Sequence, residues 1–285
     1  MSEENIMVLY HAGCPDGFGS AWSFWRRYGE KADYVPVKHG ESPPDIKGRK
    51  VFVVDFSYPR TILLQMNEDA ESLTVLDHHI SAQKDLGDLD FCHFNMNHSG
   101  AYLSWVHLFG EDNVPLLISY IEDRDLWKWE LDSSMEILSA VDAFKKDFKT
   151  WDRLSSFLDA VNSITWAKVR SMGEGILKYK DTLIASVSRH QYRIDILEYN
   201  VPVINVPFFQ SEIASDMAEG EDFSAAYYYD GEGYCFSLRS RDDGVDVSKI
   251  ASCFGGGGHR NAAGFRVVDL KMLKGVSDDK ESKSN

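Results

Sequence analysis

Three ionisable residues follow directly on an apolar segment in residues 75–80, which read VLDHHI. Apolar runs of this length are typical of buried strands, and an unpaired charge in a protein interior costs several kcal/mol. Asp77, His78 and His79 therefore need a partner. A divalent metal ion is one such partner, and a solvated turn at the end of the strand is the alternative.

Carboxylates recur at comparable positions in the N-terminal half. Asp16, Asp55 and Asp123 each lie at the end of a predicted strand or helix. Carboxylates that repel one another are stable together only where a cation or protons neutralise them. Mixed carboxylate and imidazole ligands suit Mn²⁺, with Mg²⁺ and Co²⁺ as alternatives. The four cysteines have no CxxC spacing, so neither structural zinc nor a disulfide framework is indicated.

A second candidate site lies in residues 255–265, which read GGGGHRNAAGF. Glycines let backbone N–H groups approach an anion closely, and His259 and Arg260 would add charged donors. Arg239 and Arg241 could reach the same phosphate. A flexible turn is the alternative interpretation of the glycines.

The segments that must position the first set of residues alternate between strand and helix patterns. Strands are predicted at residues 5–11, 33–37, 51–55 and 73–77, and helices at 18–28 and 59–67. This alternation predicts an α/β fold with a parallel sheet, in which ligands bind beyond the carboxyl ends of the strands. His11, Asp55 and Asp77 fall at those ends.

The remaining chain is first helical and then β-rich. Helices are predicted at 99–109, with Ser99 as N-cap, and at 114–122, followed by helical residues to about 189. Strand patterns fill 193–206 and 224–240, residues 246–254 read as a helix, and the glycines precede a last strand. We predict an N-terminal domain with a helical connector (1–189), a smaller α/β domain with a mixed sheet (190–273), and a disordered polar tail (274–285).

Composition limits the classes of function. With 285 residues, 44% of them hydrophobic, the chain is long enough for two domains. A net charge of −15 argues against coating long nucleic acid, but it allows a short anionic substrate held by a metal and a few basic groups. No apolar run approaches the roughly 20 residues that span a bilayer, and the first residues are acidic where a signal peptide is basic. A cytoplasmic protein without membrane attachment is expected, and a homodimer is left open.

Together these motifs resemble the DHH phosphoesterase superfamily. The N-terminal part of the resemblance is the DHH of residues 77–79, preceded by residues 11–20 and by VVD at 53–55 and followed by Asp123. The C-terminal part comprises SLRS at 237–240, VDVSKIA at 245–251 and the glycine-rich GGGGHRNAAGF, which look like the DHH-associated domain. Both halves match in the expected order, over most of the chain.

The resemblance implies a two-domain phosphohydrolase with two metal ions and an active site between the domains. It implies metal ligation by His11, Cys14, Asp16, Asp55, His78 and Asp123, with Asp55 bridging the two ions. Asp77 and His79 are implied as catalytic residues, with His79 contacting the substrate or supporting the attacking water. Arg239, Gly256, Gly257, Gly258 and His259 are implied as ligands of the substrate's terminal phosphate.

The first motif departs from the family pattern His-x-x-x-Asp-x-Asp, because residues 11–20 read HAGCPDGFGS. If the serine at the end of this segment is aligned with the family, Asp16 corresponds to the second aspartate of the pattern and Cys14 stands at the position of the first. If Pro-Asp is aligned instead, Phe18 stands at the position of the second aspartate. We prefer the first alignment, since it keeps Asp-Gly and the serine together. Cys14 is then either a soft metal ligand or a small buried thiol.

The predicted function is hydrolysis of phosphoester bonds in a short phosphorylated substrate, an oligonucleotide or a nucleoside phosphate, without a covalent intermediate. The alternatives are phosphoanhydride hydrolysis of the exopolyphosphatase or pyrophosphatase type and a non-catalytic nucleotide or metal sensor. Asp125 is the alternative to Asp123 as a ligand. Trp127 and Trp129 nearby offer either a base-stacking surface or core packing.

Overall fold

The computed structural model describes residues 5–38 and 40–274 of the chain. The chain forms two compact units, Met1–Leu177 and Lys178–Asn285, which are described separately below. Their boundary falls inside helix α8 (Ile164–Ser188), and the predicted domain boundary at residue 189 directly follows the end of that helix. The predicted tail lies outside the described residues, apart from Lys274.

The N-terminal unit contains a five-stranded parallel sheet with the strand order β2-β1-β3-β4-β5. Its strands are β1 (Ile6–His11), β2 (Ala32–Val37), β3 (Lys50–Val54), β4 (Ser72–Asp77) and β5 (Cys92–Phe94). The predicted parallel α/β fold is confirmed. The short strand β5, and helix α3 (Ile80–Leu86) before it, were not predicted, since neither is long enough for a clear periodic pattern.

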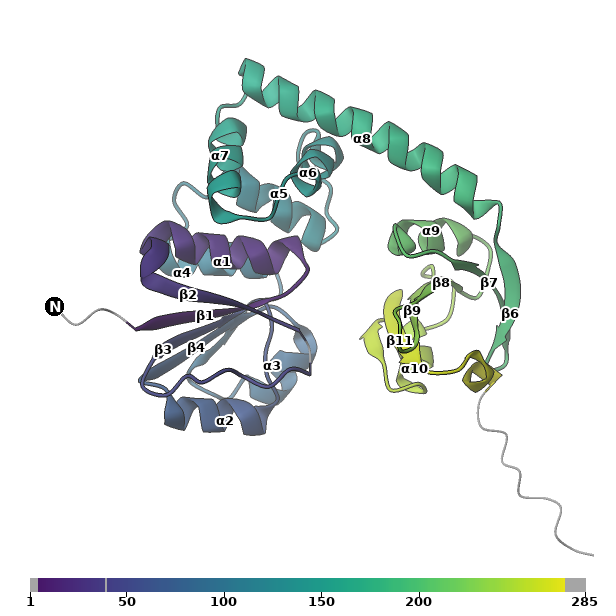
Figure 1. Cartoon of the computed structure of the whole chain (residues 1–285), viewed down its shortest axis with the longest axis horizontal. Helices are drawn as coiled ribbons and strands as arrows, with labels where there is room; N and C mark the ends of the chain where they lie inside the picture. The colour runs from purple at the N-terminus through teal and green to yellow at the C-terminus, as the bar shows by residue number, and fades with distance from the viewer. Residues whose placement is uncertain (1–4, 39, 275–285) are drawn as a thin grey trace, which may run out of the picture. The chain divides into compact units, whose positions relative to one another are not determined.

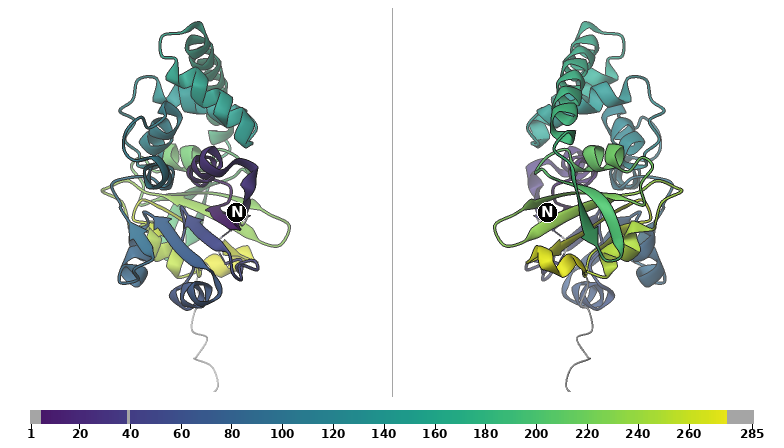
Figure 2. Two further views of the ribbon diagram at one scale, coloured as in Figure 1. Left: turned by 90° about the vertical axis from the view of Figure 1, so that its left-hand side faces the viewer. Right: turned by 90° about the vertical axis from the view of Figure 1, so that its right-hand side faces the viewer.

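Helices cover both faces of this sheet, which explains why its strands read as continuous apolar runs. Helices α1 (Pro15–Tyr28) and α4 (Gly100–Phe109) lie on one face, and α2 (Arg60–Asp69) and α3 lie on the other (Figure 1; left panel of Figure 2). Neighbouring residues of one strand pack on opposite faces. Val8 packs with Phe24 of α1, whereas Leu9 packs with Leu63 of α2.

A helical layer packs on the outer side of α1. It consists of α5 (Leu116–Asp125), α6 (Ser134–Ala143), α7 (Phe148–Asp159) and the first part of α8. Phe18 and Trp22 of α1 lie in one core with Ile118 of α5 and Trp151 of α7. Each such buried side chain contributes about 1.5–3 kcal/mol to folding. This core fixes α5 against α1, and therefore fixes the end of α5 near the start of α1.

The C-terminal unit contains a six-stranded mixed sheet with the order β10-β11-β9-β8-β7-β6. Its strands are β6 (Tyr192–Ile196), β7 (Tyr199–Asn205), β8 (Ser224–Tyr229), β9 (Tyr234–Arg239), β10 (Gly257–His259) and β11 (Ala262–Val267). Only β7 and β8 pair in parallel among these strands. The predicted mixed sheet is confirmed.

Two short helices cover this sheet, and two details differ from the sequence-based expectation. Helix α9 (Gln210–Met217) was not predicted, whereas α10 (Val247–Ser252) lies within the predicted helix and has Asp246 as its N-cap. The glycine run, predicted as a loop, contains the edge strand β10. Across both units, no helix of the described chain combines the length and apolar character needed to cross a membrane.

Candidate metal centre

The order of the parallel strands brings the candidate residues of the N-terminal unit to one place. The chain leaves β1 toward β2 on one side and returns as β3 on the other side of β1, which is a topological switch point. His11 ends β1, Asp55 directly follows β3, and Asp77 ends the next strand, β4. Ligands of parallel α/β sheets bind at such points, beyond the carboxyl ends of the strands.

His11, Cys14 and Asp55 form a first cluster of candidate ligands. The Cys14 Sγ atom lies 3.4 Å from His11 Nδ1 and 3.2 Å from Asp55 Oδ2, and it accepts the N–H of Gly17 at 3.1 Å as the N-cap of α1. Burial, aided by Asp55, raises the pKa of the Cys14 thiol. Phe18 lies in the core instead. The structure thus places Cys14, and not Phe18, beside His11 and Asp55.

A glycine is required beside this cluster. A Cβ atom on Gly17 would lie 2.2 Å from the carbonyl oxygen of His11. Gly17 therefore lets the first turn of α1 approach the end of β1 closely enough for Cys14 and His11 to meet. This requirement explains the glycine that follows Asp16 in the motif.

Asp55 and His78 belong to a second cluster, together with His79. His78 Nε2 lies 3.3 Å from Asp55 Oδ1. Asp55 has a left-handed backbone with φ of +63°, which is rare for a residue other than glycine and turns the chain sharply after β3. Burial alone would raise the pKa of Asp55, but hydrogen bonds from His11 and His78 outweigh it and lower that pKa.

Asp16, His78 and Asp125 form a third cluster. His78 Nε2 lies 3.7 Å from Asp16 Oδ2 and 3.5 Å from Asp125 Oδ2. Burial, together with the negative charge of Asp55, raises the pKa of both aspartates. Burial acts to lower the pKa of His78, but Asp55 and Asp125 outweigh it and raise that pKa.

The N-terminus of α4 holds Asp16 in place. The backbone N–H groups of Gly100 and Ala101 donate to its two carboxylate oxygens at 2.7 and 2.9 Å. Free N–H groups at the start of a helix are natural partners of a carboxylate. The predicted N-cap at Ser99 implied such donors, although sequence alone did not assign them to Asp16. A Cβ on Gly100 would lie 2.6 Å from the Asp55 Cβ, so only glycine fits there.

The structure does not bring Asp123, the ligand preferred from sequence, to these clusters; it brings Asp125 instead. The Asp123 carboxylate accepts the backbone N–H groups of Glu130 at 2.8 Å and Leu131 at 3.4 Å. It is buried and holds the loop that follows α5. Residues two apart on a helix face different directions, so only one of these aspartates can face His78.

Asp77 supports His79 without belonging to a cluster. Its Oδ1 atom lies 2.7 Å from His79 Nδ1 and accepts the backbone N–H of His78 at 2.7 Å, while Oδ2 accepts the Ser57 hydroxyl at 2.6 Å. The hydrogen bond with Asp77 raises the pKa of His79. Asp77 is therefore best described as a positioning residue for His79. Ser57 was not singled out from sequence.

The donor set of the three clusters fits divalent metal ions. Asp55 and His78 are each shared by two clusters, so the clusters form one continuous group in the described part of the chain. Carboxylate oxygens, imidazole nitrogens and one thiol are ligands of first-row divalent metals. Two of the carboxylates, those of Asp16 and Asp55, are fully buried at the same site, which is stable only with compensating positive charge or protons.

The predicted phosphate ligands of the C-terminal unit divide between the two faces of its sheet. His259 pairs with Ala262, which pairs with Arg239, so their side chains share one face. Gly257 lies on the same face because it is two residues from His259. Gly256 and Gly258 have a packing role instead, since a Cβ on either would lie 2.1 or 2.5 Å from a carbonyl oxygen of β11.

Arg239 is the anchored cation of this face. Its guanidinium is half-buried and donates to the Ser211 hydroxyl at 2.5 Å and the Leu238 carbonyl at 2.7 Å. Burial lowers its pKa. The negative charge of Glu212 acts on Arg239, although no ion pair of Arg239 is found among residues 5–38 and 40–274.

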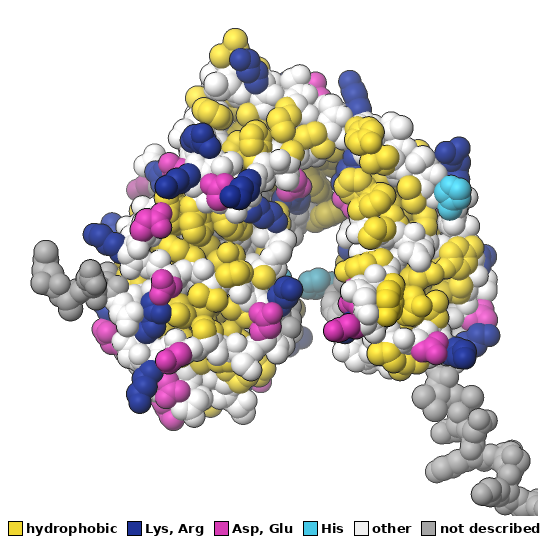
Figure 3. Space-filling model, viewed as in Figure 1, with side chains coloured by type: hydrophobic (Ala, Val, Ile, Leu, Met, Phe, Trp, Pro, Cys, Tyr) yellow, Lys and Arg dark blue, Asp and Glu magenta, His cyan; other side chains and the backbone are white. Residues whose placement is uncertain are grey.

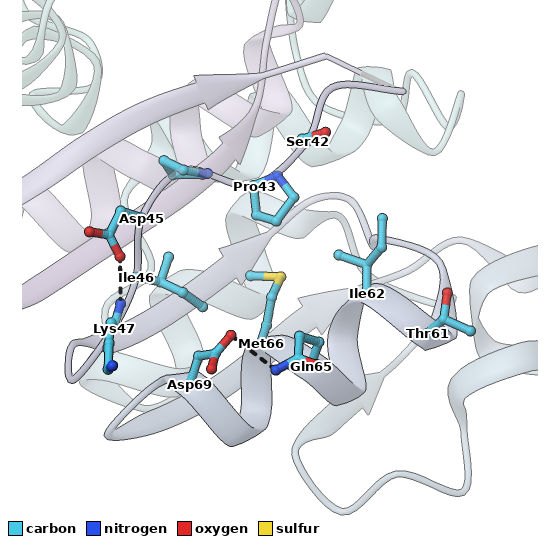
Figure 4. Close-up of a pocket in the computed structure, with 11 residues that line it drawn as sticks. Ser42, Pro43, Asp45, Ile46, Lys47, Thr61, Ile62, Gln65, Met66 and Asp69 are labelled. Carbon is cyan, nitrogen blue, oxygen red and sulfur yellow. Dashed lines mark hydrogen bonds between the residues drawn. The ribbon is translucent and has the colours of Figure 1, made fainter.

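A pocket of about 600 Å³ lies elsewhere in the N-terminal unit, between residues 42–47 and helix α2. In Figure 4, Ile46, Ile62 and Met66 line it, with Lys47 and Asp69 at its edge. It contains none of the residues of the three clusters. We therefore place the candidate chemistry at the clusters and not in this pocket.

Comparison with known proteins agrees with this fold. No model of a known protein family matches the chain. The chain is 31% identical to an uncharacterized protein of Acanthamoeba polyphaga mimivirus over 293 residues, which covers 93% of this chain and 68% of that protein. A shorter match, 36% identical over 75 residues, covers 26% of this chain and 9% of the A-adding tRNA nucleotidyltransferase of Aquifex aeolicus.

Three solved structures share the fold over most of the chain. The DHH domain of a member of a family of ribosomal proteins has a TM-score of 0.54 and 13% identity, covering 92% of this chain and 82% of its own. Exonuclease RecJ bound to manganese has a TM-score of 0.52 and 15% identity, covering 94% and 87%. The pGpG-specific phosphodiesterase of Vibrio cholerae has a TM-score of 0.52 and 14% identity, covering 94% of each chain. The chain therefore belongs to one family with the mimivirus protein, and its fold is that of the DHH-domain proteins.

Proposed function

We propose that this protein is a metal-dependent hydrolase of phosphoester bonds in short nucleotidic substrates. The observation that carries the proposal is the continuous group of three candidate ligand clusters, joined by Asp55 and His78, at the switch point of the parallel sheet. An isolated cluster of acidic residues would be weak support for a metal site, since exposed acidic groups are common without an ion. Here the residues come from the ends of β1, β3, β4 and α5 and from the start of α1, and backbone groups at the start of α4 fix one of them.

His11, Cys14 and Asp55 would hold one ion, and Asp16, His78 and Asp125 would hold a second, with Asp55 close to both. Imidazole and carboxylate ligands favour Mn²⁺, and the manganese bound to the RecJ neighbour supports this choice. Two such ions supply Lewis-acid stabilisation and activation of water for in-line displacement at phosphorus. We carry Asp125 forward as the ligand in place of Asp123 because of its distance to His78.

His79 is the residue we propose to touch the substrate in this unit. Asp77 engages its Nδ1 atom, so Nε2 is the nitrogen left to donate to a phosphate oxygen or a leaving group. The raised pKa of His79 keeps it protonated at higher pH than an ordinary histidine. Asp77 acts through His79 by holding its ring and tautomer.

A terminal phosphate of the substrate would bind in the C-terminal unit, on the sheet face that carries Arg239, Gly257 and His259. Gly257 supports this role because a side chain there would meet no atom within 4 Å. The packing of the fold therefore does not require glycine at this position. A ligand that approaches the backbone closely would require it. Gly256 and Gly258 contribute by shaping the strand.

A short substrate agrees with the charges of the molecule. The net charge is −15, and on the face shown in Figure 3 the Lys and Arg side chains are scattered among acidic ones without forming one basic patch. Long duplex nucleic acid is bound largely by neutralising many phosphates. A few basic groups and the metal ions are sufficient to bind a short phosphorylated substrate.

The test is hydrolysis by purified protein with Mn²⁺ of di- to pentanucleotides, adenosine bisphosphate, cyclic dinucleotides and polyphosphate. We expect turnover of at least one nucleotidic substrate, loss of that turnover in His78→Ala, and normal turnover in His190→Ala, whose histidine is exposed and outside the clusters. Hydrolysis of polyphosphate alone would replace the phosphoester proposal with the phosphoanhydride one. Mn²⁺ binding without hydrolysis of any of them would indicate a sensor.

A further inference from the structure

Trp127 is the exposed tryptophan of this chain. Its exposed fraction is 70%, whereas the other six of the seven tryptophans are buried or half-buried. Large aromatic side chains are normally placed where they lose contact with water. An indole presented to solvent therefore calls for a reason other than packing.

The backbone at this position is also unusual. Trp127 and Trp129 have left-handed backbones, with φ of +57° and +54°. Residues other than glycine adopt this conformation at an energetic cost, and such residues cluster at ligand-binding sites. A glycine at residue 127 would avoid the cost, but it would remove the indole.

The loop that carries Trp127 is held firmly. The carbonyl oxygen of Asp123 accepts the N–H groups of Lys128 at 2.8 Å and Trp129 at 3.3 Å, and the Asp123 carboxylate binds the next two N–H groups. Trp129 packs against the helical core, and the Trp127 ring lies edge-to-face on it with a centroid distance of 5.3 Å and an angle of 77°. The exposed ring is thus pre-positioned.

Trp127 also lies next to the candidate metal centre. It follows Asp125 by two residues, and Cα atoms two residues apart are at most about 7 Å from each other. Asp125 Oδ2 is 3.5 Å from His78 Nε2. The backbone of residue 127 is therefore close to that of a candidate ligand, and a substrate whose phosphate lies at the clusters has only a short distance to extend to reach this loop.

We propose that Trp127 is a stacking platform for a nucleobase of the substrate. This inference rests on the proposed function and narrows its substrate class, because polyphosphate and pyrophosphate have no ring to stack. The neighbouring residues Lys128 and Glu130 are exposed and charged, a setting unlike the core of a protein interface, from which charged residues are depleted. Stacking tolerates any base, so specificity for one sequence is not implied. Asp123 is a positioning residue in this scheme.

Binding is measured by calorimetry with Ca²⁺ in place of Mn²⁺, so that affinity is read without turnover. The ligands are a dinucleotide, the same compound with one abasic residue, and tripolyphosphate. Stacking on one base predicts that Trp127→Ala weakens binding of the dinucleotide by about 5-fold to 150-fold. Binding of tripolyphosphate should not change, and Trp127→Phe should restore most of the affinity.

Tyr179→Ala is the matched control, because Tyr179 is a similarly exposed aromatic residue on α8, at 66%. It should bind the dinucleotide as the wild type does. The thermal unfolding temperature of Trp127→Ala should stay close to that of the wild type, which separates stacking from a structural role.

Two results would overturn the inference: an unchanged dinucleotide affinity in Trp127→Ala, or an equal loss for tripolyphosphate. Its failure is distinguishable from failure of the proposed function. If wild-type protein hydrolyses a nucleotide with Mn²⁺ and Trp127→Ala binds that nucleotide normally, only the stacking inference fails. If binding depends on Trp127 but no substrate is hydrolysed, only the hydrolase proposal fails.

Discussion

Gly100→Ala tests whether the close approach of α4 to Asp55 builds the metal centre. The added Cβ would lie 2.6 Å from the Asp55 Cβ, 2.8 Å from its Oδ1 and 2.9 Å from its Cα. Part of this obstacle is backbone, so rotating the Asp55 side chain cannot remove it. Either Asp55 or the start of α4 must move.

The size of the movement follows from these distances. Ordinary contacts of a Cβ begin at 3.4 Å, so the two Cβ atoms must separate by 3.4 − 2.6, or about 0.8 Å. Overpacking of this kind costs about 1–3 kcal/mol of stability. A misplacement of about 1 Å at a catalytic centre can lower turnover about a hundredfold. The Gly100 N–H bond to Asp16 would be displaced at the same time.

Three measurements on Gly100→Ala follow: urea unfolding without metal, Mn²⁺ affinity by calorimetry, and hydrolysis. We expect the free energy of unfolding to fall by about 1–3 kcal/mol. Mn²⁺ should bind more weakly, and the rate of hydrolysis should fall about a hundredfold. Gly175→Ala is the matched control, because Gly175 lies inside α8 and a Cβ atom added there would meet no atom within 4 Å. Alanine there should stabilise the helix by up to about 1 kcal/mol and leave Mn²⁺ binding unchanged.

Wild-type Mn²⁺ affinity in a folded Gly100→Ala protein would refute the reasoning. It would mean that Asp55, or the start of α4 with the Asp16 carboxylate bonded to it, can move without disturbing Mn²⁺ binding, and hence that these residues do not form a metal centre. A loss of stability alone would not support the metal centre, because overpacking by itself explains that loss.

The remaining predictions concern the ligand choice, the phosphate face and metal removal. Asp125→Asn should abolish tight Mn²⁺ binding. Asp123→Asn should keep the ligands and lower stability by about 1–3 kcal/mol, because the amide oxygen replaces only one of the two carboxylate acceptors and one loop N–H is left unpaired. Calorimetry and urea unfolding distinguish the two variants. Because the pKa of Asp125 is raised on folding, its ionisation opposes folding increasingly as pH rises from about 4 through the raised pKa. The metal-free Asp125→Asn protein should therefore gain stability relative to wild type at neutral pH and lose that gain in acid, and the opposite trend would contradict the assignment. His259→Ala should raise KM and remove any preference for a phosphorylated end without changing Mn²⁺ affinity; Gly257→Ala should do the same in a stable protein, whereas Gly256→Ala should mainly destabilise the fold. Adding Mn²⁺ at about 100 times its Kd should stabilise the metal-free protein by about 2.7 kcal/mol, and a melting temperature indifferent to Mn²⁺ would argue against a metal site in the folded state.

The local sequence pattern was sufficient to predict most strands of the N-terminal sheet. The apolar run before His11 and that before Asp77 were assigned to strands within a residue of their observed bounds. Burial on both faces makes such runs continuous, so their length and composition identify them. The short elements α3, β5 and α9 were missed because a few residues do not complete a periodic pattern.

The glycine run shows where local pattern is ambiguous. Gly256, Gly257 and Gly258 look alike in sequence, and their shared backbone freedom suggested a single phosphate-binding loop. In the folded chain, Gly256 and Gly258 face backbone atoms of the neighbouring strand and Gly257 faces open space. The pairing register with β11 makes this distinction, and register depends on residues distant in the chain.

What the sequence determined by itself was the chemistry available: carboxylates and imidazoles at the ends of apolar strands, with a thiol at Cys14 in the same motif as His11. Only the tertiary structure decided which of these groups meet. The strand order brings Asp55 beside His11, and the packing of α5 against α1 brings Asp125, and not Asp123, to His78. Sequence spacing specifies the direction of a side chain relative to its own helix or strand, whereas the direction of that helix or strand is set by the hydrophobic surfaces it buries against the rest of the fold.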